Sequence, residues 1–311
     1  MPNHIKPMQL LALVVTTVVL LSTRTTSASG TTAGTTDVGY LPVFAYHGFG
    51  GSGEDFATMA KWVEAAHPGQ DFVAIDMFNG AASYKPMWEQ VDAVAAFIRN
   101  YTAVHGLTRY HVIGHSQGAI AMRTLAQSMD DHNIASLISL AGPQMGQFGS
   151  LNHWPAPLHD LEADLAWIVL YTKPMQATFS AAGYWNDPYH QKEFCRDSLY
   201  LAVANNVSLP SNPRADAFRA NILRLGSFSL LGSPDDGTIQ PWESTMFGFW
   251  SDHRSDIVPL EDQPFYKADM LGLRSLAEDG RLHLSAPIGV SHMDWVRDEA
   301  VFRAHILPLL T

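Results

Sequence analysis

Short apolar runs and longer amphipathic stretches alternate along most of this chain. The apolar runs predict buried strands, and the stretches with apolar residues at helical spacing predict helices. In one such stretch, Phe56, Met59, Ala60 and Val63 recur at positions that share one face of a helix. The expected strands cover 41–46, 72–75, 110–114, 137–141, 228–232 and 282–287. The expected helices cover 55–66, 86–105, 118–129 and 299–310.

This alternation predicts an α/β fold, in which a mostly parallel sheet carries helices on both faces. The rhythm stops after residue 142, where Trp, Tyr, His, Pro and Asn become frequent, and it resumes near residue 228. We therefore expect one domain over 41–311, with an inserted cap of short helices and loops at about 143–219.

The first residues have the pattern of a targeting segment. Lys6 precedes the apolar run LLALVVTTVVLL at 10–21, and small polar residues follow it. A run of this length is short for a membrane span but typical of a secretory signal. We expect a signal peptide at 1–29 and a linker at 30–40, and an uncleaved anchor helix is the alternative.

Composition and charge exclude several classes of function. Of the 311 residues 47% are hydrophobic, as in an ordinary folded globule rather than a disordered chain. The formal net charge is −11, from 30 acidic and 19 basic side chains, and the sequence has no basic stripe. Nucleic acid is therefore not an expected partner, and stable membrane insertion is not expected once the signal is removed.

Entry into the secretory pathway gives meaning to two further features. The sequons NYT at 100–102 and NVS at 206–208 make Asn100 and Asn206 candidate glycosylation sites. Cys195 is the only cysteine, so no internal disulfide is possible and the fold must rest on its core. We interpret Cys195 as a small buried hydrophobe rather than a nucleophile.

One pentapeptide carries a chemical signal. Gly114-His115-Ser116-Gln117-Gly118 fits the G-x-S-x-G pattern and lies between an expected strand and an expected helix. In that context the serine occupies a tight turn at the edge of the sheet, in front of a helix N-terminus that favours negative charge. The pattern predicts that Ser116 is a nucleophile, and a plain turn with a surface serine is the alternative.

A nucleophilic serine needs a base and an acid that orients the base. In this kind of fold both follow the serine in the chain, the acid first, and each comes after a strand. The expected strand at 282–287 is followed by IGVSHMDW, which makes His292 the candidate base. After the strand at 228–232 comes SPDDG, where Asp235 and Asp236 compete for the third role. We favour Asp236, because an acid next to Gly237 can point back toward the site, while Asp235 is better placed to hold the turn.

The same architecture requires two backbone N–H donors for the oxyanion. One is the N–H of Gln117, directly after the serine, and the other is expected in His47-Gly48-Phe49-Gly50 after the first strand, at Phe49. No metal site is expected: His111 and His115 are four positions apart on a strand-to-turn segment, and no Glu of an H-E-x-x-H motif lies between them.

Taken together, these stretches resemble the palmitoyl-protein thioesterase family, nearest its second, lysosomal type. The resemblance extends from about residue 42 to residue 310 and includes HGFGGSGEDF, YKPMWEQV, VIGHSQGAI, MDDHNIASLISLAGPQMGQFG, YWNDPYH, GSPDDGTIQPWESTMFGFW and GVSHMDW. Two departures stand out, since the chain cannot form the disulfides usual in that family and has Ala119 where a second glycine is usual.

The resemblance implies an α/β-hydrolase fold and hydrolysis of long-chain fatty acyl thioesters, such as palmitoyl-CoA or S-acylated proteins, without a cofactor. It maps the nucleophile, acid and base onto Ser116, Asp236 and His292, and the oxyanion donors onto Phe49 and Gln117. It also implies a lysosomal location, whereas the signal segment by itself indicates only the secretory pathway, with the lysosome or the cell exterior as destination.

An acyl chain needs an apolar groove. Met145 and Phe148 are our candidates to line one, together with tryptophans of the insertion, although the same residues could form the insertion's own core. Two other functions remain open from the sequence. One is a lipase or carboxylesterase acting on oxygen esters, and the other is a catalytically silent lipid-binding module of the same fold.

Overall fold

The computed structural model of this chain describes residues 39–311, apart from 153 and 156–157. The predicted signal peptide therefore lies outside the described residues, as does nearly all of the predicted linker.

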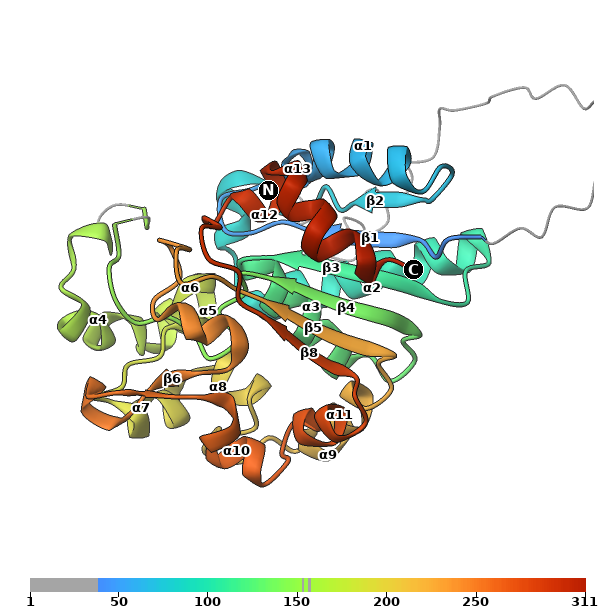
Figure 1. The fold of residues 1–311 in the computed structure, drawn as a ribbon. Coiled ribbons are helices and arrows are strands. Elements are labelled where there is room, and N and C mark those ends of the chain that lie inside the picture. The colour runs from blue at the N-terminus through green and yellow to red at the C-terminus, as the bar shows by residue number, and fades with distance from the viewer. Residues whose placement is uncertain (1–38, 153, 156–157) are drawn as a thin grey trace, which may run out of the picture. The chain divides into compact units, whose positions relative to one another are not determined.

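A central sheet of six strands organises the molecule (Figure 1). All neighbouring strands run parallel, as the alternating sequence pattern predicts. In spatial order the strands are β2 (Phe72–Ala74), β1 (Val43–Tyr46), β3 (Tyr110–His115), β4 (Ile134–Leu140), β5 (Ser227–Leu231) and β8 (Leu282–Ser285). Because the strands are parallel, the loops that follow them all leave from one edge of the sheet.

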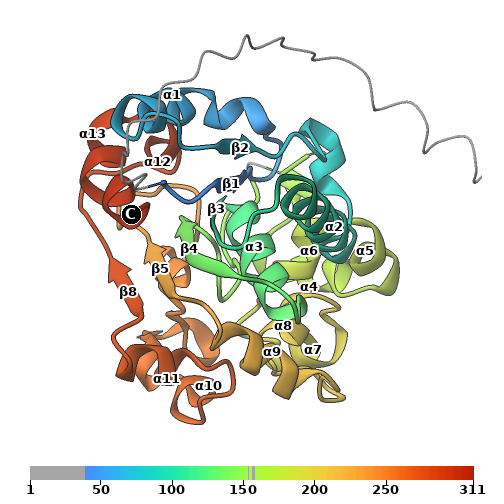
Figure 2. The same cartoon turned by 90° about the vertical axis from the view of Figure 1, so that its right-hand side faces the viewer.

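Helices cover both faces of this sheet (Figure 2). One face carries α1 (Ala57–Ala66), α12 (Asp294–Arg297) and α13 (Glu299–Val301), and the other carries α2 (Met87–His105) and α3 (Gln117–Ser128). The predicted fold class is confirmed, and the expected strands and the first three helices lie within a few residues of their predicted bounds.

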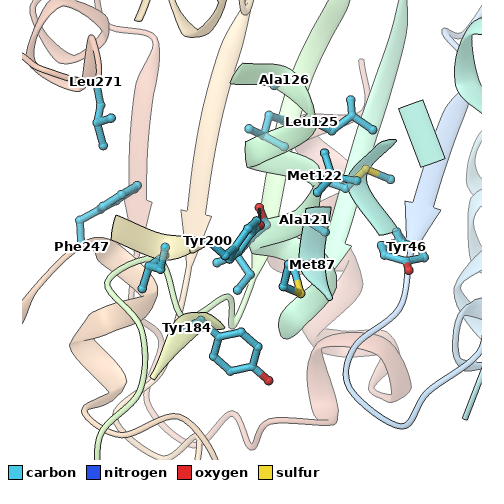
Figure 3. Packing of buried hydrophobic residues seen from close by; sticks show 14 of the residues in the cluster. Tyr46, Met87, Ala121, Met122, Leu125, Ala126, Tyr184, Tyr200, Phe247 and Leu271 are labelled. Atoms are coloured by element: carbon cyan, nitrogen blue, oxygen red, sulfur yellow. Dashed lines mark hydrogen bonds between the residues drawn. The ribbon is translucent and has the colours of Figure 1, made fainter. Parts of the chain in front are cut away.

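Alternation along the strands divides the core into two layers. In β1, Phe44 and Tyr46 belong to the cluster beneath α2 and α3, while Val43 and Ala45 belong to the cluster beneath α1 and α12. Figure 3 shows part of the first cluster, where Tyr46 of β1, Met87 of α2 and Met122 of α3 meet. The four central strands, β1, β3, β4 and β5, are thus buried on both faces. This burial explains why their sequences are continuous apolar runs.

Among the described residues between β4 and β5 there are six α-helices, a 3-10 helix at Leu158–Asp160 and no strand of the sheet. The α-helices are α4 (Ala163–Leu170), α5 (Lys173–Thr178), α6 (Ser180–Tyr184), α7 (Gln191–Asp197), α8 (Leu201–Ala204) and α9 (Ala215–Ile222). The last of them packs against α3. These helices lie at 163–222, so most of them fall within the stretch at about 143–219 where the alternation in the sequence stops.

The sequence pattern missed the elements between β5 and β8. The structure has a two-stranded antiparallel sheet there, β6 (Phe249–Trp250) with β7 (Ile257–Val258), and then α10 (Pro264–Lys267) and α11 (Leu273–Glu278). Each is too short for either periodicity to show in the sequence.

The final helix was predicted as one continuous element over 299–310, and that prediction is wrong in detail. The chain forms α13 for one turn, continues as a π-helix over Phe302–Ile306 and ends as a 3-10 helix over Leu307–Leu309. Pro308 lacks an N–H and so cannot continue an α-helical ladder, which is consistent with the 3-10 helix at the end of the chain. The predicted apolar face is present, because Phe302, Ile306 and Leu310 are fully buried.

One buried histidine of β3 leads to a prediction about stability in acid. His111 is 1% exposed and neither of its ring nitrogens has a hydrogen-bond partner. Burial, with a smaller effect from Arg109, lowers its pKa to about 4. Since the pKa of an unfolded histidine is about 6.5, the unfolded chain takes up this proton first. The neutral His111 therefore makes its full contribution to the free energy of unfolding above pH ~6.5. That contribution is lost as the pH falls toward 4, by about 2 kcal/mol between pH 7 and pH 5.

We therefore compare the free energy of unfolding of His111→Leu with that of the wild type at two pH values. The difference, variant minus wild type, is expected to be about 2 kcal/mol more positive at pH 5 than at pH 7. Urea unfolding at the two pH values measures this difference, and His283→Leu, at an exposed position of β8, is the control. Equal pH dependence in the wild type and His111→Leu would contradict the assignment.

Candidate active site

Ser116 lies on the turn between β3 and α3, where the sequence motif places it. Its φ is 56°, a left-handed conformation that is rare for a residue other than glycine, and its N–H donates to Leu140 O at 2.8 Å. The turn is possible because Gly118 lacks a side chain: a Cβ there would lie 2.3 Å from Tyr46 O. The backbone thereby presents Ser116 at the N-terminus of α3, whose dipole favours negative charge.

His292 and Asp236 form a buried pair. His292 Nδ1 lies 2.8 Å from Asp236 Oδ2 and 3.0 Å from Asp236 Oδ1, and His292 N–H also donates to Asp236 O at 2.9 Å. Asp236 Oδ1 further accepts the N–H groups of Thr238 and Ile239, at 3.0 and 2.7 Å. The carboxylate is therefore fixed by its own turn and holds the imidazole by Nδ1, which leaves Nε2 available on the other side of the ring.

Asp235 is placed differently from its neighbour. Its side chain is exposed, and its Oδ2 accepts the N–H of Gly289 at 2.7 Å. Of the two candidate acids in the sequence, Asp236 alone contacts His292, and Asp235 ties the acid loop to the loop that carries the histidine.

His115, the second residue of the pentapeptide, contacts His292. Its Nε2 lies 2.9 Å from His292 O, and the two rings are 4.8 Å apart. Burial lowers the pKa of His115 to about 3, and the neighbouring His292 adds to the effect. The ring is therefore neutral across the mildly acidic range and can donate Nε2–H to His292 O without adding a second positive charge at the site.

The predicted oxyanion loop passes close to Ser116. A Cβ at Gly48 would lie 2.8 Å from Ser116 Cβ and 3.3 Å from its Oγ, so only glycine permits this approach. Within the described part of the chain Phe49 N–H has no hydrogen-bond acceptor. Gln117 N–H is at the first position of α3, where an N–H has no partner inside the helix. Both predicted donors are thus free beside the serine.

A cavity of about 450 Å³ opens at this point, and Ser116, His292 and Phe49 line it. Part of its wall is apolar, from Trp154, Tyr184, Ile239 and Met293. The charged side chains among its lining residues are Asp55 and Arg297. Three of the five predicted catalytic and oxyanion residues therefore line one cavity. The other two are buried next to it: Asp236 is bonded to His292, and Gln117 directly follows Ser116 in the chain. No hydrogen bond joins Ser116 Oγ to His292 among the described residues.

The two predicted groove residues lie elsewhere. Phe148 is fully buried and packs against Trp185, and neither Phe148 nor Met145 is among the cavity-lining residues. The sequence offered no signal for Tyr184, Ile239, Met293 or Arg297, since each reaches the cavity only through the packing of the insertion and of the loops after β5 and β8.

The two candidate glycosylation sites and the cysteine differ in how far they are exposed to solvent. Asn100 is exposed on α2 and stays a candidate acceptor for a glycan. Asn206 is 8% exposed and its Nδ2 donates to Met270 O at 3.0 Å, so we do not propose a glycan there. Cys195 is half-buried, and burial raises the pKa of its thiol, in keeping with an unreactive side chain.

Two kinds of feature are absent from the described residues. No group of three or more His, Cys, Asp or Glu side chains in that part of the chain could hold a metal ion. None of its helices is long and apolar enough to cross a membrane.

Fold and site together define the class of this protein. A serine on a tight strand-to-helix turn, a histidine held by an aspartate and a loop of free N–H donors, all at one edge of a parallel sheet, are the parts of an α/β-hydrolase. The family model for palmitoyl protein thioesterase matches residues 42–292. The chain belongs to the palmitoyl protein thioesterase family and is a thioester hydrolase, which confirms the resemblance seen in the sequence.

Individual relatives agree over nearly the whole length. The chain is 35% identical over 274 residues to the lysosomal thioesterase PPT2 of Bos taurus, and the match covers 88% of each protein. It is 36% identical over 278 residues to the lysosomal thioesterase PPT2 of Rattus norvegicus, again with 88% of each covered. The lysosomal thioesterase PPT2 homolog of Drosophila melanogaster is 35% identical over 274 residues, which cover 87% of this chain and 92% of that protein.

Proposed function

We propose that this enzyme hydrolyses long-chain fatty acyl thioesters through an acyl-enzyme formed on Ser116. The observation that carries the proposal is the buried Asp236–His292 pair, whose histidine lines the same cavity as a serine held at positive φ. A serine hydroxyl is a weak nucleophile until a base accepts its proton, and an imidazole held at Nδ1 by a carboxylate is suited to that task.

In the first step Ser116 Oγ attacks the thioester carbonyl while His292 Nε2 takes the hydroxyl proton. Phe49 N–H and Gln117 N–H donate to the oxyanion, and the N-terminus of α3 adds its dipole. The carbon–sulfur bond then breaks, and the leaving sulfur takes the proton from His292, which returns the imidazole to its neutral form. A thiol has a pKa of about 8.5, so it leaves with less help than an alcohol.

In the second step water attacks the acyl-enzyme and gives a proton to His292. The ester bond to Ser116 Oγ then breaks, His292 returns the proton to that oxygen, and the fatty acid is released. The apolar wall of Trp154, Tyr184, Ile239 and Met293 suits the acyl chain near the reacting carbon. Asp55 and Arg297 give the cavity a polar side, where a leaving group such as a peptide or a CoA thiol can lie.

We also propose that the chain enters the secretory pathway through residues 1–29 and acts in the lysosome. Support comes from the apolar run at 10–21 and from relatives that are named lysosomal thioesterases. Residues at about 143–219 form the cap of the hydrolase domain in this proposal, since they supply Trp154, from a loop, and Tyr184, from α6, to the cavity.

A comparison of two substrates with the same acyl chain tests the reaction. Purified protein is expected to release thiol from palmitoyl-CoA and to hydrolyse the umbelliferyl ester of palmitate more slowly. A fluorophosphonate that labels reactive serines should stop both reactions. Turnover of the oxygen ester with none of the thioester would contradict the proposal and favour a lipase. No turnover of either by folded protein would favour a silent lipid-binding module.

A further inference from the structure

Ser83 is a buried serine that the sequence motifs do not mark. It lies in the 3-10 helix Gly80–Tyr84, between β2 and α2, and is fully buried. Its Oγ accepts the N–H of Gly50 at 2.7 Å and donates to Gly80 O at 2.6 Å. Its carbonyl oxygen accepts from Gln117 Nε2 at 2.9 Å. One residue therefore contacts both the loop of Phe49 and the residue after the nucleophile.

The hydroxyl acts on the first oxyanion donor through the neighbouring peptide. Gly50 directly follows Phe49, so the bond to Ser83 Oγ fixes the far side of Phe49. On the near side, Gly48 O accepts the N–H of Gly51 at 3.1 Å and lies 2.9 Å from His47 Nδ1. Gly48 O and Phe49 N–H belong to one planar peptide and point in opposite directions. Holding both flanking peptides therefore fixes the direction of Phe49 N–H.

The carbonyl acts on the second donor. Gln117 supplies the other predicted N–H, and its side chain is anchored at Ser83 O. The same oxygen accepts from Gln90 Nε2 at 2.8 Å and Ser180 Oγ at 3.1 Å, so α2 and the insertion hold it in place. The two donors, which come from loops after different strands, are thus joined through a single buried residue.

We propose that Ser83 is a positioning residue that sets the separation and direction of the two oxyanion donors. The inference rests on the proposed function of this site and adds a residue to it. An oxyanion donor stabilises the transition state only when it is already aimed at the developing charge. Loss of the Ser83 hydroxyl removes the acceptor of Gly50 N–H. The peptide between Phe49 and Gly50 can then rotate, and the direction of Phe49 N–H is no longer fixed.

Ser83→Ala is expected to lower kcat for palmitoyl-CoA by about 10-fold, less than the ~10²–10³-fold typical when a donor is lost altogether. KM should change less than twofold, because the ground-state carbonyl makes little use of the donors. A palmitoyl trifluoromethyl ketone, which forms a tetrahedral adduct with the serine, should bind about 10-fold more weakly. Palmitate, the product, should bind as it does to the wild type.

Ser244→Ala is the matched control. Ser244 is also fully buried, and its Oγ accepts a backbone N–H, from Met145 at 3.1 Å, and donates to a backbone carbonyl, that of Gly146. Both variants lose a buried hydroxyl with two such bonds, so both should lose thermal stability. The selective loss of kcat and of ketone binding should occur only in Ser83→Ala.

Equal kinetics in the two alanine variants, or a Ser83→Ala defect that lies in KM alone, would overturn the inference while leaving the wild-type reaction intact. Failure of the wild type to hydrolyse the thioester would instead count against the proposed function. If Ser83→Ala does not fold, Ser83→Cys takes its place, because it keeps the volume but replaces the hydroxyl with a weak acceptor. The same 10-fold loss of kcat is expected, and full activity in Ser83→Cys would overturn the inference.

Discussion

Replacing Ser116 with alanine is expected to lower kcat for palmitoyl-CoA on the order of 10⁶-fold. The variant keeps the cavity, the Asp236–His292 pair and the two free N–H donors, but nothing is left to form the acyl-enzyme. Ser116 Oγ makes no hydrogen bond among the described residues, so the fold should survive the change. The strain at φ 56° is the same for alanine and serine, because both carry a Cβ.

Ser128→Ala at the other end of α3 is the control for this prediction. Its hydroxyl donates only to Leu125 O, at 3.2 Å, and lies at the far end of the helix from the cavity. The control should keep wild-type turnover and the same melting temperature within a few degrees. Persistent thioester turnover by a homogeneous preparation of Ser116→Ala would show that the reaction does not pass through this serine.

The catalytic candidates could be predicted because each follows a strand. In a parallel sheet the carboxyl ends of all strands meet at one edge, so Ser116 after β3, Asp236 after β5 and His292 after β8 converge whatever lies between them. The strands in turn were visible because they are buried on both faces and read as apolar runs. Position along the chain was enough to choose His292 from among 14 histidines.

The walls of the cavity could not be predicted in this way. Phe148 and Trp154 both belong to an aromatic stretch and both pack against Trp185, yet only Trp154 lines the cavity. Their fates depend on how short helices pack on one another, and the insertion has no periodicity that reports this. The role of Ser83 could not be predicted for a related reason. Its hydroxyl contacts the backbone of Gly50 and its carbonyl contacts the side chain of Gln117, and neither contact requires a sequence motif.

Asp236→Asn is the second large effect we expect, with kcat for thioester hydrolysis falling by about 10⁴-fold. The geometry dictates which way the new amide turns. Asp236 Oδ1 accepts the N–H groups of Thr238 and Ile239, and an asparagine can keep both bonds only with its oxygen at that position. Its NH₂ group then replaces Oδ2 and faces His292 Nδ1, 2.8 Å away in the wild type. Two donors cannot share that contact, so the imidazole must carry its proton on Nε2.

An imidazole with its proton on Nε2 cannot accept the proton of Ser116, although every atom is close to its original place. The loss should therefore appear in kcat, with the fold and the cavity preserved, and thermal melting should show little change. Asp235→Asn is the matched control: it makes the same change one residue earlier, where the carboxylate is exposed and accepts only Gly289 N–H. It should retain activity within about threefold, since an asparagine oxygen can accept that bond equally well. Comparable losses in the two variants would mean that the acid loop matters for its shape, whereas a loss confined to Asp236→Asn identifies the tautomer of His292 as what the carboxylate controls.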